Sequence, residues 1–163
     1  MKKSTALLAI VLFVMIALAA LFLIGGTMSA RLSVVTAGGA DYPKAFAAIR
    51  EVLESGDAPQ MLSQGAVPEA EACRLEDVTI TLKNRGLLPA EWLYVQVEGA
   101  PGDIAVYSVT GEGSSVPARS TASINLKLIA DARGSGDRTY HVQYYVYGMK
   151  RTLTVRREDS EAQ

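Results

Sequence analysis

The sequence has very little of the side chains on which catalytic and metal sites depend. Its 163 residues include one histidine (His141), one cysteine (Cys73) and one tryptophan (Trp92). A single cysteine excludes an internal disulfide, and a single histidine excludes a zinc site built on two histidines. Four acidic residues fall in predicted turns, where backbone geometry alone explains them. These are Asp103, Glu112, Asp131 and Asp137. We therefore expect no catalytic residue, no metal site and no cofactor, and a protein that is not an enzyme.

The lone histidine and the lone cysteine both have simple structural interpretations. His141 falls on the outward phase of a predicted strand, so we expect it to face solvent. Cys73 lies among acids in "EAEACRLE", which would raise the pKa of its thiol and lower its reactivity. We expect a small packing cysteine. A disulfide between two copies of the chain is the alternative.

Charge is almost missing from residues 1–30, which hold no acid and only Lys2 and Lys3. The stretch from Thr5 to Gly26 is uncharged and nearly all apolar. As a helix it would extend about 33 Å, against roughly 30 Å of bilayer hydrocarbon. The sequence therefore predicts one transmembrane helix, with the lipid bilayer as a partner through residues 5–26.

A cleaved secretory signal is the alternative for this N-terminal segment, because "TMSA" supplies small residues after the apolar run. Signal-peptide apolar regions usually span about 7–15 residues, which favours an uncleaved anchor here. Lys2 and Lys3 should stay in the cytoplasm, so the rest of the chain is expected outside it.

The chain beyond the anchor shows no strong charge bias. Its 14 basic and 17 acidic residues give a net charge of −3. No basic excess points to nucleic acid, and no acidic tract points to a metal buffer.

One helix is predicted in the spacer, residues 31–73. Asp41 and Pro43 are typical of a helix start and Gly56 of a stop, so we expect a helix from Tyr42 to Ser55. Four apolar residues recur at helical spacing on one face: Phe46, Ile49, Val52 and Leu53. This face should dock on the following domain or on a neighbouring copy. The stretch "GDAPQMLSQGAVPEAEA" after it is typical of a linker.

From Leu75 onwards the apolar period changes from about four residues to two, which is typical of strands with one buried face. Six runs show it: "DVTITLKN", "WLYVQVEG", "DIAVYSVTG", "STASINLKLIA", "RTYHVQYYVYG" and "KRTLTVRR". Turn-forming residues separate them. Six short half-buried strands without helices between them predict a mainly β fold, an antiparallel β-sandwich.

Two runs carry a resemblance to a known architecture. "LEDVTITLKNRGLLPAEWLYVQV" and the later "VPARSTASINLKLIA" resemble the immunoglobulin- or fibronectin-type domains of bacterial membrane-anchored envelope proteins. The resemblance covers roughly the last 85 residues and implies an Ig-like fold with an adhesive or assembly role. The Cys…Trp…Cys core of antibody domains is absent.

The stretch "NRGLLPAEWLYVQV" concentrates apolar residues in a loop. We expect Leu87 and Leu88 to close the open end of the sandwich. Trp92 is out of phase with the inward residues of its strand. It could pack on Phe46 and Ile49 of the spacer helix, remain exposed as a binding residue, or return to the core at a bulge.

A second apolar feature is the outward phase of the fifth run, which carries His141, Tyr145 and Tyr147. Arginines of the sixth run should lie nearby, and tyrosine with arginine is typical of an interaction surface. If the register is reversed, these tyrosines form the core instead. The candidate interaction residues are Leu87, Leu88, Trp92, Tyr145, Tyr147 and Arg151.

The predicted order is a stub and anchor (1–30), a helical spacer (31–73), an Ig-like sandwich (74–157) and a polar tail (158–163). We expect a single-pass, extracytoplasmic, non-catalytic binding or assembly module of the cell envelope. Its expected partner is an envelope protein, with a second copy of the chain as another candidate. A secreted sandwich released by signal cleavage and an accessory subunit of an envelope enzyme or transporter are the alternatives.

Overall fold

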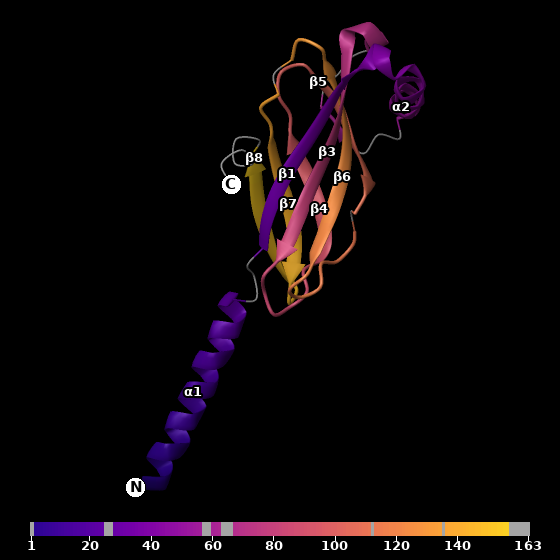
Figure 1. Cartoon of the computed structure of the whole chain (residues 1–163). Helices are drawn as coiled ribbons and strands as arrows, with labels where there is room; N and C mark the ends of the chain where they lie inside the picture. The colour runs from indigo at the N-terminus through magenta and orange to yellow at the C-terminus, as the bar shows by residue number, and fades with distance from the viewer. Residues whose placement is uncertain are drawn as a thin grey trace.

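All six alternating runs form strands in the computed structural model. The model describes residues 2–24, 28–56, 60–62, 67–111, 113–134 and 136–156. The six strands are β3 (Cys73–Asn84), β4 (Glu91–Glu98), β5 (Asp103–Thr110), β6 (Thr121–Asp131), β7 (Thr139–Val146) and β8 (Met149–Arg156). They belong to two antiparallel sheets that face each other as a sandwich (Figure 1). The predicted fold class, mainly antiparallel β, is confirmed.

Two further strands precede the six. β1 (Met28–Gly38) pairs with β3 along its whole length, from Met28 opposite Asn84 to Gly38 opposite Arg74. The short β2 (Gln60–Met61) pairs with β5. The sheets therefore run β1-β3-β6-β5-β2 and β4-β7-β8. Residues 28–38, which the sequence analysis divides between anchor and spacer, instead form an edge strand. Backbone pairing on one side holds such a strand with little help from an apolar pattern.

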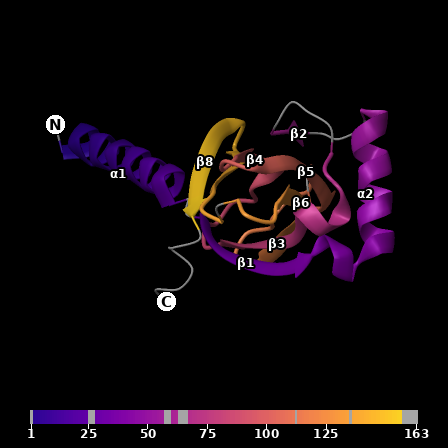
Figure 2. The same cartoon turned by 90° about the horizontal axis from the view of Figure 1, so that it is seen from above.

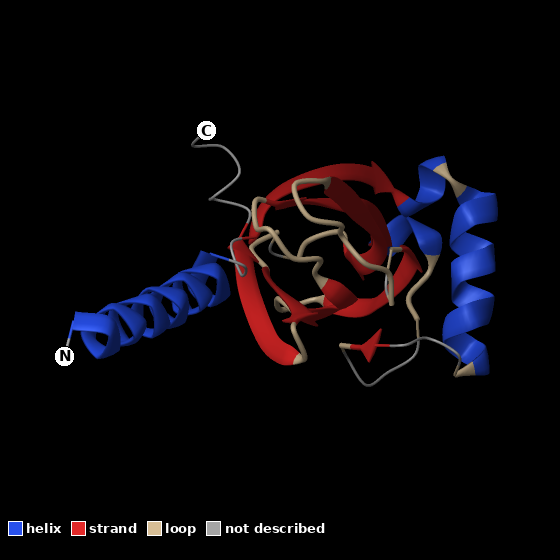
Figure 3. Ribbon diagram, turned by 90° about the horizontal axis from the view of Figure 1, so that it is seen from below, coloured by secondary structure: helices blue, strands red, loops and turns tan. Residues whose placement is uncertain are grey.

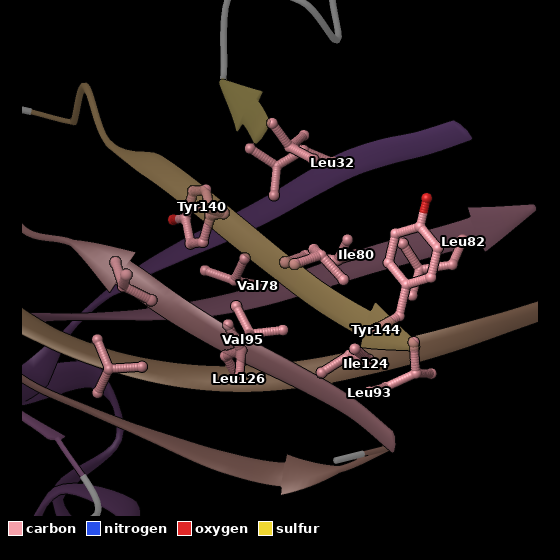
Figure 4. Packing of buried hydrophobic residues seen from close by; sticks show 14 of the residues in the cluster. Leu32, Val78, Ile80, Leu82, Leu93, Val95, Ile124, Leu126, Tyr140 and Tyr144 are labelled. Atoms are coloured by element: carbon pink, nitrogen blue, oxygen red, sulfur yellow. The ribbon is translucent and has the colours of Figure 1, made fainter. Parts of the chain in front are cut away.

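The main core lies between the two sheets, where inward side chains alternate with outward ones. Figure 4 shows Ile80 and Leu82 of β3 facing Leu93 and Val95 of β4 across this core. Tyr140 is also buried, so β7 has the predicted register and not the reversed one.

A second, smaller core lies on the outer face of the larger sheet, under α2 (Pro43–Ser55). The helix buries Phe46, Ile49 and Leu53 against β5 and β6, beside Cys73. Figures 2 and 3 show α2 outside the ring of strands, on the side away from α1. Pro43 at its first turn and Gly56 at its end, with φ 80°, match the predicted signals. The apolar face of this helix therefore docks on the sandwich, as expected.

The first helix, α1 (Lys2–Ile24), extends away from one end of the sandwich (Figure 1). Its large apolar side chains between residues 7 and 18 are exposed. Within the described part of the chain, no helix combines the length and the hydropathy needed to cross a membrane. The predicted span also includes Gly25 and Gly26, which lie outside the described residues, as does the predicted tail, 158–163.

The long axis of the sandwich defines two ends. The helix-proximal end, named for α1 and not for α2, lies next to α1 (Figure 1). Strands β1, β4, β6 and β8 begin there, and β3 and β7 finish there. The helix-distal end is the opposite one, where β3 begins at Cys73 and β7 at Thr139.

Candidate binding surface and a buried ionic cluster

Trp92 lies at the helix-proximal end, at the start of β4, with 68% of its surface exposed. The pairing of β4 with β7 is irregular between Glu91 and Tyr94, and Trp92 there adopts φ 55°. Of the three positions that the sequence left open for Trp92, the structure shows the exposed one, and Trp92 does not pack on Phe46 and Ile49. The reason is topological: β4 belongs to the three-stranded sheet, whereas α2 covers the outer face of the other one.

Three tyrosines accompany Trp92 on or beside the outer face of the β4-β7-β8 sheet. Tyr94 is 50% exposed, Tyr145 36% and Tyr147 73%. We call Trp92, Tyr94, Tyr145 and Tyr147 the aromatic surface. A depression of about 390 Å³ there is lined by Glu91, Trp92, Tyr145 and Gly148. Tyr94 is an addition to the predicted residues, and its position two residues after Trp92 on the same strand was the available signal.

Leu87 and Leu88, which were both expected to close the end of the sandwich, differ in burial. Leu88 is half-buried and packs against the main core, as a closing residue should. Leu87 is 41% exposed. Only Leu88 therefore has the predicted position at the end of the core.

A buried asparagine holds the loops of this end together. The Nδ2 of Asn84 lies 2.8 Å from the carbonyl oxygen of Leu88 and 3.1 Å from that of Val116. Its Oδ1 accepts a hydrogen bond of 2.9 Å from the Gly86 amide. These bonds join the loop after β3 to the segment before β6, so the predicted Asn-Arg-Gly turn is a fixed structure.

Arg151 does not join the aromatic surface on the face of Tyr145. In an antiparallel pair, residues directly opposite each other point to the same face. Arg151 is paired with the inward Tyr144, whereas Lys150 is paired with Tyr145. The hairpin has Tyr147 and Gly148 as its two turn residues, with φ 56° and 73°. The cation beside Tyr145 is therefore Lys150.

His141 lies on the outer face of the β4-β7-β8 sheet, with 33% of its side chain exposed. Its Nε2 is 3.5 Å from Glu98 Oε2, and its Nδ1 is 3.3 Å from Thr154 Oγ1. These contacts run across an open sheet surface, where water competes for every polar group. The histidine therefore has the partners of a surface side chain.

The helix-distal end contains a buried ionic cluster that the sequence analysis missed. Arg138, Glu76 and Asp103 have side chains that are at most 1% exposed. Arg138 donates two hydrogen bonds of 2.6 Å to the two oxygens of Asp103 and one of 2.6 Å to Glu76. Arg74 Nε lies 2.7 Å from the other Glu76 oxygen. A fork of donors facing carboxylates is the geometry in which a guanidinium binds most strongly.

Two groups at the cluster have raised pKa values. Burial alone would lower the pKa of the Arg138 guanidinium, but the carboxylates of Asp103 and Glu76 outweigh burial and raise it. Tyr140 lies next to the cluster, and burial raises the pKa of its hydroxyl to about 12. Both groups therefore keep their protons to a higher pH than they would in water.

Cys73 belongs to the small core beneath α2 and is 2% exposed. Burial raises the pKa of its thiol, and Asp131 adds to the effect. The direction agrees with the sequence interpretation, although burial and not the neighbouring acids is the main cause. Such a thiol has the properties of a packing residue.

A second hollow, of about 210 Å³, lies between α2 and the larger sheet. Its walls include Val35, Tyr42, Ile49, Leu75 and Leu128. Among the described residues, no three or more His, Cys, Asp or Glu side chains gather in a way that could hold a metal ion.

Comparisons with known proteins find likeness in structure. No protein-family profile and no curated protein sequence matches the chain. The GAE domain of yeast GGA1 is 11% identical, with a TM-score of 0.40, over 59% of this chain and 94% of that one. A FixG-related protein from Vibrio parahaemolyticus is 14% identical, with a TM-score of 0.36, over 78% of this chain and 93% of that one. Both TM-scores are below 0.5, so these likenesses assign the chain to no family. The predicted resemblance reaches no further than the generic two-sheet sandwich that the chain's own strands form.

Proposed function

We propose that this protein is a non-catalytic binding or assembly module of the cell envelope, held by α1 in a membrane with its sandwich outside the cytoplasm. The observation that carries the proposal is the exposed aromatic surface beside the attachment of α1. Large aromatic side chains contribute most of the binding energy in many interfaces. A cluster of them on the surface often marks an interaction site.

The membrane part of the proposal draws on the character of α1. Its described large apolar side chains are exposed between Leu7 and Leu18, on every face of the helix. A helix that is apolar all round needs apolar surroundings on all sides. In the sequence, the uncharged stretch continues to residue 26, beyond the side chains that the structure describes. Lys2 and Lys3 before it favour a cytoplasmic N-terminus.

The non-catalytic part of the proposal draws on the polar groups. The strongest charge arrangement, Arg138 with Asp103 and Glu76, is buried, and its carboxylates are already occupied by guanidinium donors. The lone histidine contacts its neighbours at 3.3 and 3.5 Å on an open surface. Binding through the aromatic surface requires neither of them to react.

Fractionation of cells that express the full chain tests the proposal. We expect the chain in the membrane fraction, with an intact mass that includes residues 1–30. We also expect a reporter fused after Gln163 to be active only outside the cytoplasm. A mass that lacks the N-terminal segment would favour the secreted sandwich, and a reporter active in the cytoplasm would overturn the proposed orientation.

Substitution of Trp92 and Tyr147 by serine tests the binding part in the same cells. The variant should fractionate like the original chain but lose the contacts, with protein or with lipid, that chemical cross-linking traps. The double variant Thr152→Ser and Thr154→Ser, on the same sheet, is the matched control. Unchanged cross-links in the aromatic variant would exclude the aromatic surface as the binding site.

A further inference from the structure

We propose that the helix-proximal end is a lipid-contacting face. Its aromatic residues and exposed cations would bind the anionic headgroups of the same bilayer that holds α1. This inference rests on the proposed membrane anchoring and names the partner of the aromatic surface. Three independent features of the described residues support it: charge, backbone conformation and the length of the tether.

The first feature is an uneven distribution of charge along the sandwich. The helix-proximal end carries exposed cations in four different positions. They are Lys83, Arg85, Arg119 and Lys150. Among the described residues of the loops and strand ends there, Glu91 is the acidic one. The other end exposes mainly acids, among them Asp41, Glu69, Glu71 and Asp137. The net charge of the chain is slightly negative, yet the end next to α1 is positive. This positive end complements an anionic lipid surface.

The second feature is the backbone. Among the described residues, three that are not glycine have positive φ: Trp92 at 55°, Arg119 at 55° and Tyr147 at 56°. They come from three separate parts of the chain, and all lie at the helix-proximal end. Bulky side chains are disfavoured in this conformation, and a hairpin turn such as Tyr147-Gly148 usually has asparagine or glycine at its first position.

Core packing does not compensate these three conformations, because all three side chains are exposed. Trp92 and Tyr147 have 68% and 73% of their surfaces open. A contact outside the chain would offset the energetic cost of these backbone conformations. The rings of tryptophan and tyrosine prefer the boundary between headgroups and acyl chains, where the ring is covered and its polar atom stays hydrated.

The third feature is the tether. α1 finishes at Ile24 and β1 begins at Met28, so four Cα-to-Cα steps join them. Even fully extended, they span at most about 14 Å. Met28 is paired with Asn84, the residue that holds the loops of this end together. With α1 in a bilayer, this end is therefore kept within reach of the headgroup layer, which is roughly 5–8 Å thick on each side.

The experiment places the full chain in vesicles of phosphatidylcholine alone and of phosphatidylcholine mixed with phosphatidylglycerol. Trp92 is the only tryptophan, so its fluorescence reports on this end alone. We expect a shift of its emission to shorter wavelength in the anionic vesicles, together with quenching by lipids brominated near the headgroup. High salt should reverse part of the shift, because screening weakens the attraction of the cations to the lipids.

Charge reversal supplies the matched test. The triple variant Arg85→Glu, Arg119→Glu and Lys150→Glu should lose the shift and the quenching while its β-type circular dichroism stays the same. Arg133→Glu, an exposed cation of the helix-distal end, should leave both unchanged.

Each other outcome overturns the inference in a recognisable way. Long-wavelength emission in both lipids from a chain that floats with the vesicles overturns the lipid contact but leaves the anchor. Short-wavelength emission in both lipids that depends on protein density assigns the surface to a second copy of the chain. A chain that does not float with the vesicles overturns the proposed anchoring, and the lipid contact with it.

Discussion

The two ends of the sandwich differ in whether their charged and aromatic side chains are buried or exposed. At the helix-distal end, charges lie inside: Arg138, Glu76 and Asp103 are buried together, and Tyr140 beside them is buried too. At the helix-proximal end, the charges lie outside, and Trp92 and Tyr147 extend into solvent.

The difference shows which end has completed its contacts within the chain. Towards the distal end, α2 covers the outer face of the larger sheet, and each buried carboxylate there meets a guanidinium at hydrogen-bond distance. Such an end holds the two sheets together. The proximal end has loops held together by Asn84, but Trp92 and Tyr147 there have most of their surface uncovered. The proposed lipid contact would cover these rings.

Removing Arg138 should have the largest effect on this contrast. We expect Arg138→Met to lower the free energy of unfolding by about 3–5 kcal/mol, because it leaves Glu76 and Asp103 buried without their counter-charge. Denaturant unfolding of the full chain in detergent measures the change. Arg133→Met, an exposed arginine of the same end, is the control and should change stability by less than about 0.5 kcal/mol. A similar small cost for both variants would mean that the cluster does not hold the distal end together.

Alkaline pH should weaken the distal end next. The pKa of Tyr140 is raised to about 12 in the folded chain, against about 10 when unfolded. Its contribution is complete below pH 10 and is lost as the pH rises towards 12, because the unfolded chain gives up the proton more easily. The loss should reach roughly 2–3 kcal/mol. Tyr140→Phe should flatten this part of the pH profile of stability.

Tyr144, near the proximal end, provides the comparison for that profile. Burial also raises its pKa, but Arg151 acts in the opposite direction. Arg138 likewise lowers the pKa of Tyr140, but there the carboxylates of Glu76 and Asp103 add to the rise. We therefore expect Tyr144→Phe to flatten the alkaline fall less than Tyr140→Phe does. Equal effects would remove the electrostatic difference between the two ends.

The smallest effect concerns the proximal loop, where two adjacent leucines form a matched pair. Leu88→Ala should cost roughly 1–2 kcal/mol, since its half-buried side chain closes the main core. Leu87→Ala should cost less than about 0.5 kcal/mol, because the side chain is 41% exposed. Unfolding of both variants under the same conditions gives the comparison, and a larger cost for Leu87 would reverse their assigned roles.

The strands themselves were predictable because each repeats a local pattern. Val78, Ile80 and Leu82 alternate with polar residues, and the structure buries that phase of β3. β1 was missed because an edge strand needs only one paired side, and its single fully buried apolar side chain is Leu32. Glu76 stands on the same phase as Val78. A charged residue at a core position was therefore the signal for the ionic cluster, but its partners could not be read from the pattern.

The errors at the candidate surface have equally specific causes. The sequence left three positions open for Trp92, because burial preference favours a covered tryptophan but does not show which sheet lies beneath a helix. Arg151 was assigned to the tyrosine face because the face of every residue in β8 depends on the length of the preceding turn. With two turn residues, Lys150 and not Arg151 lies opposite Tyr145.

By itself, the sequence determined the periodicities: an uncharged apolar helix, one amphipathic helix and six strands with a defined inner face. Those patterns depend on neighbours within a few residues. The tertiary structure alone decided which distant residues meet. Arg138 meets Asp103 from 35 positions away and Glu76 from 62. Trp92, Arg119 and Tyr147 reach one end from three separate parts of the chain. Strand order and register bring such residues together, and both depend on how the whole chain packs.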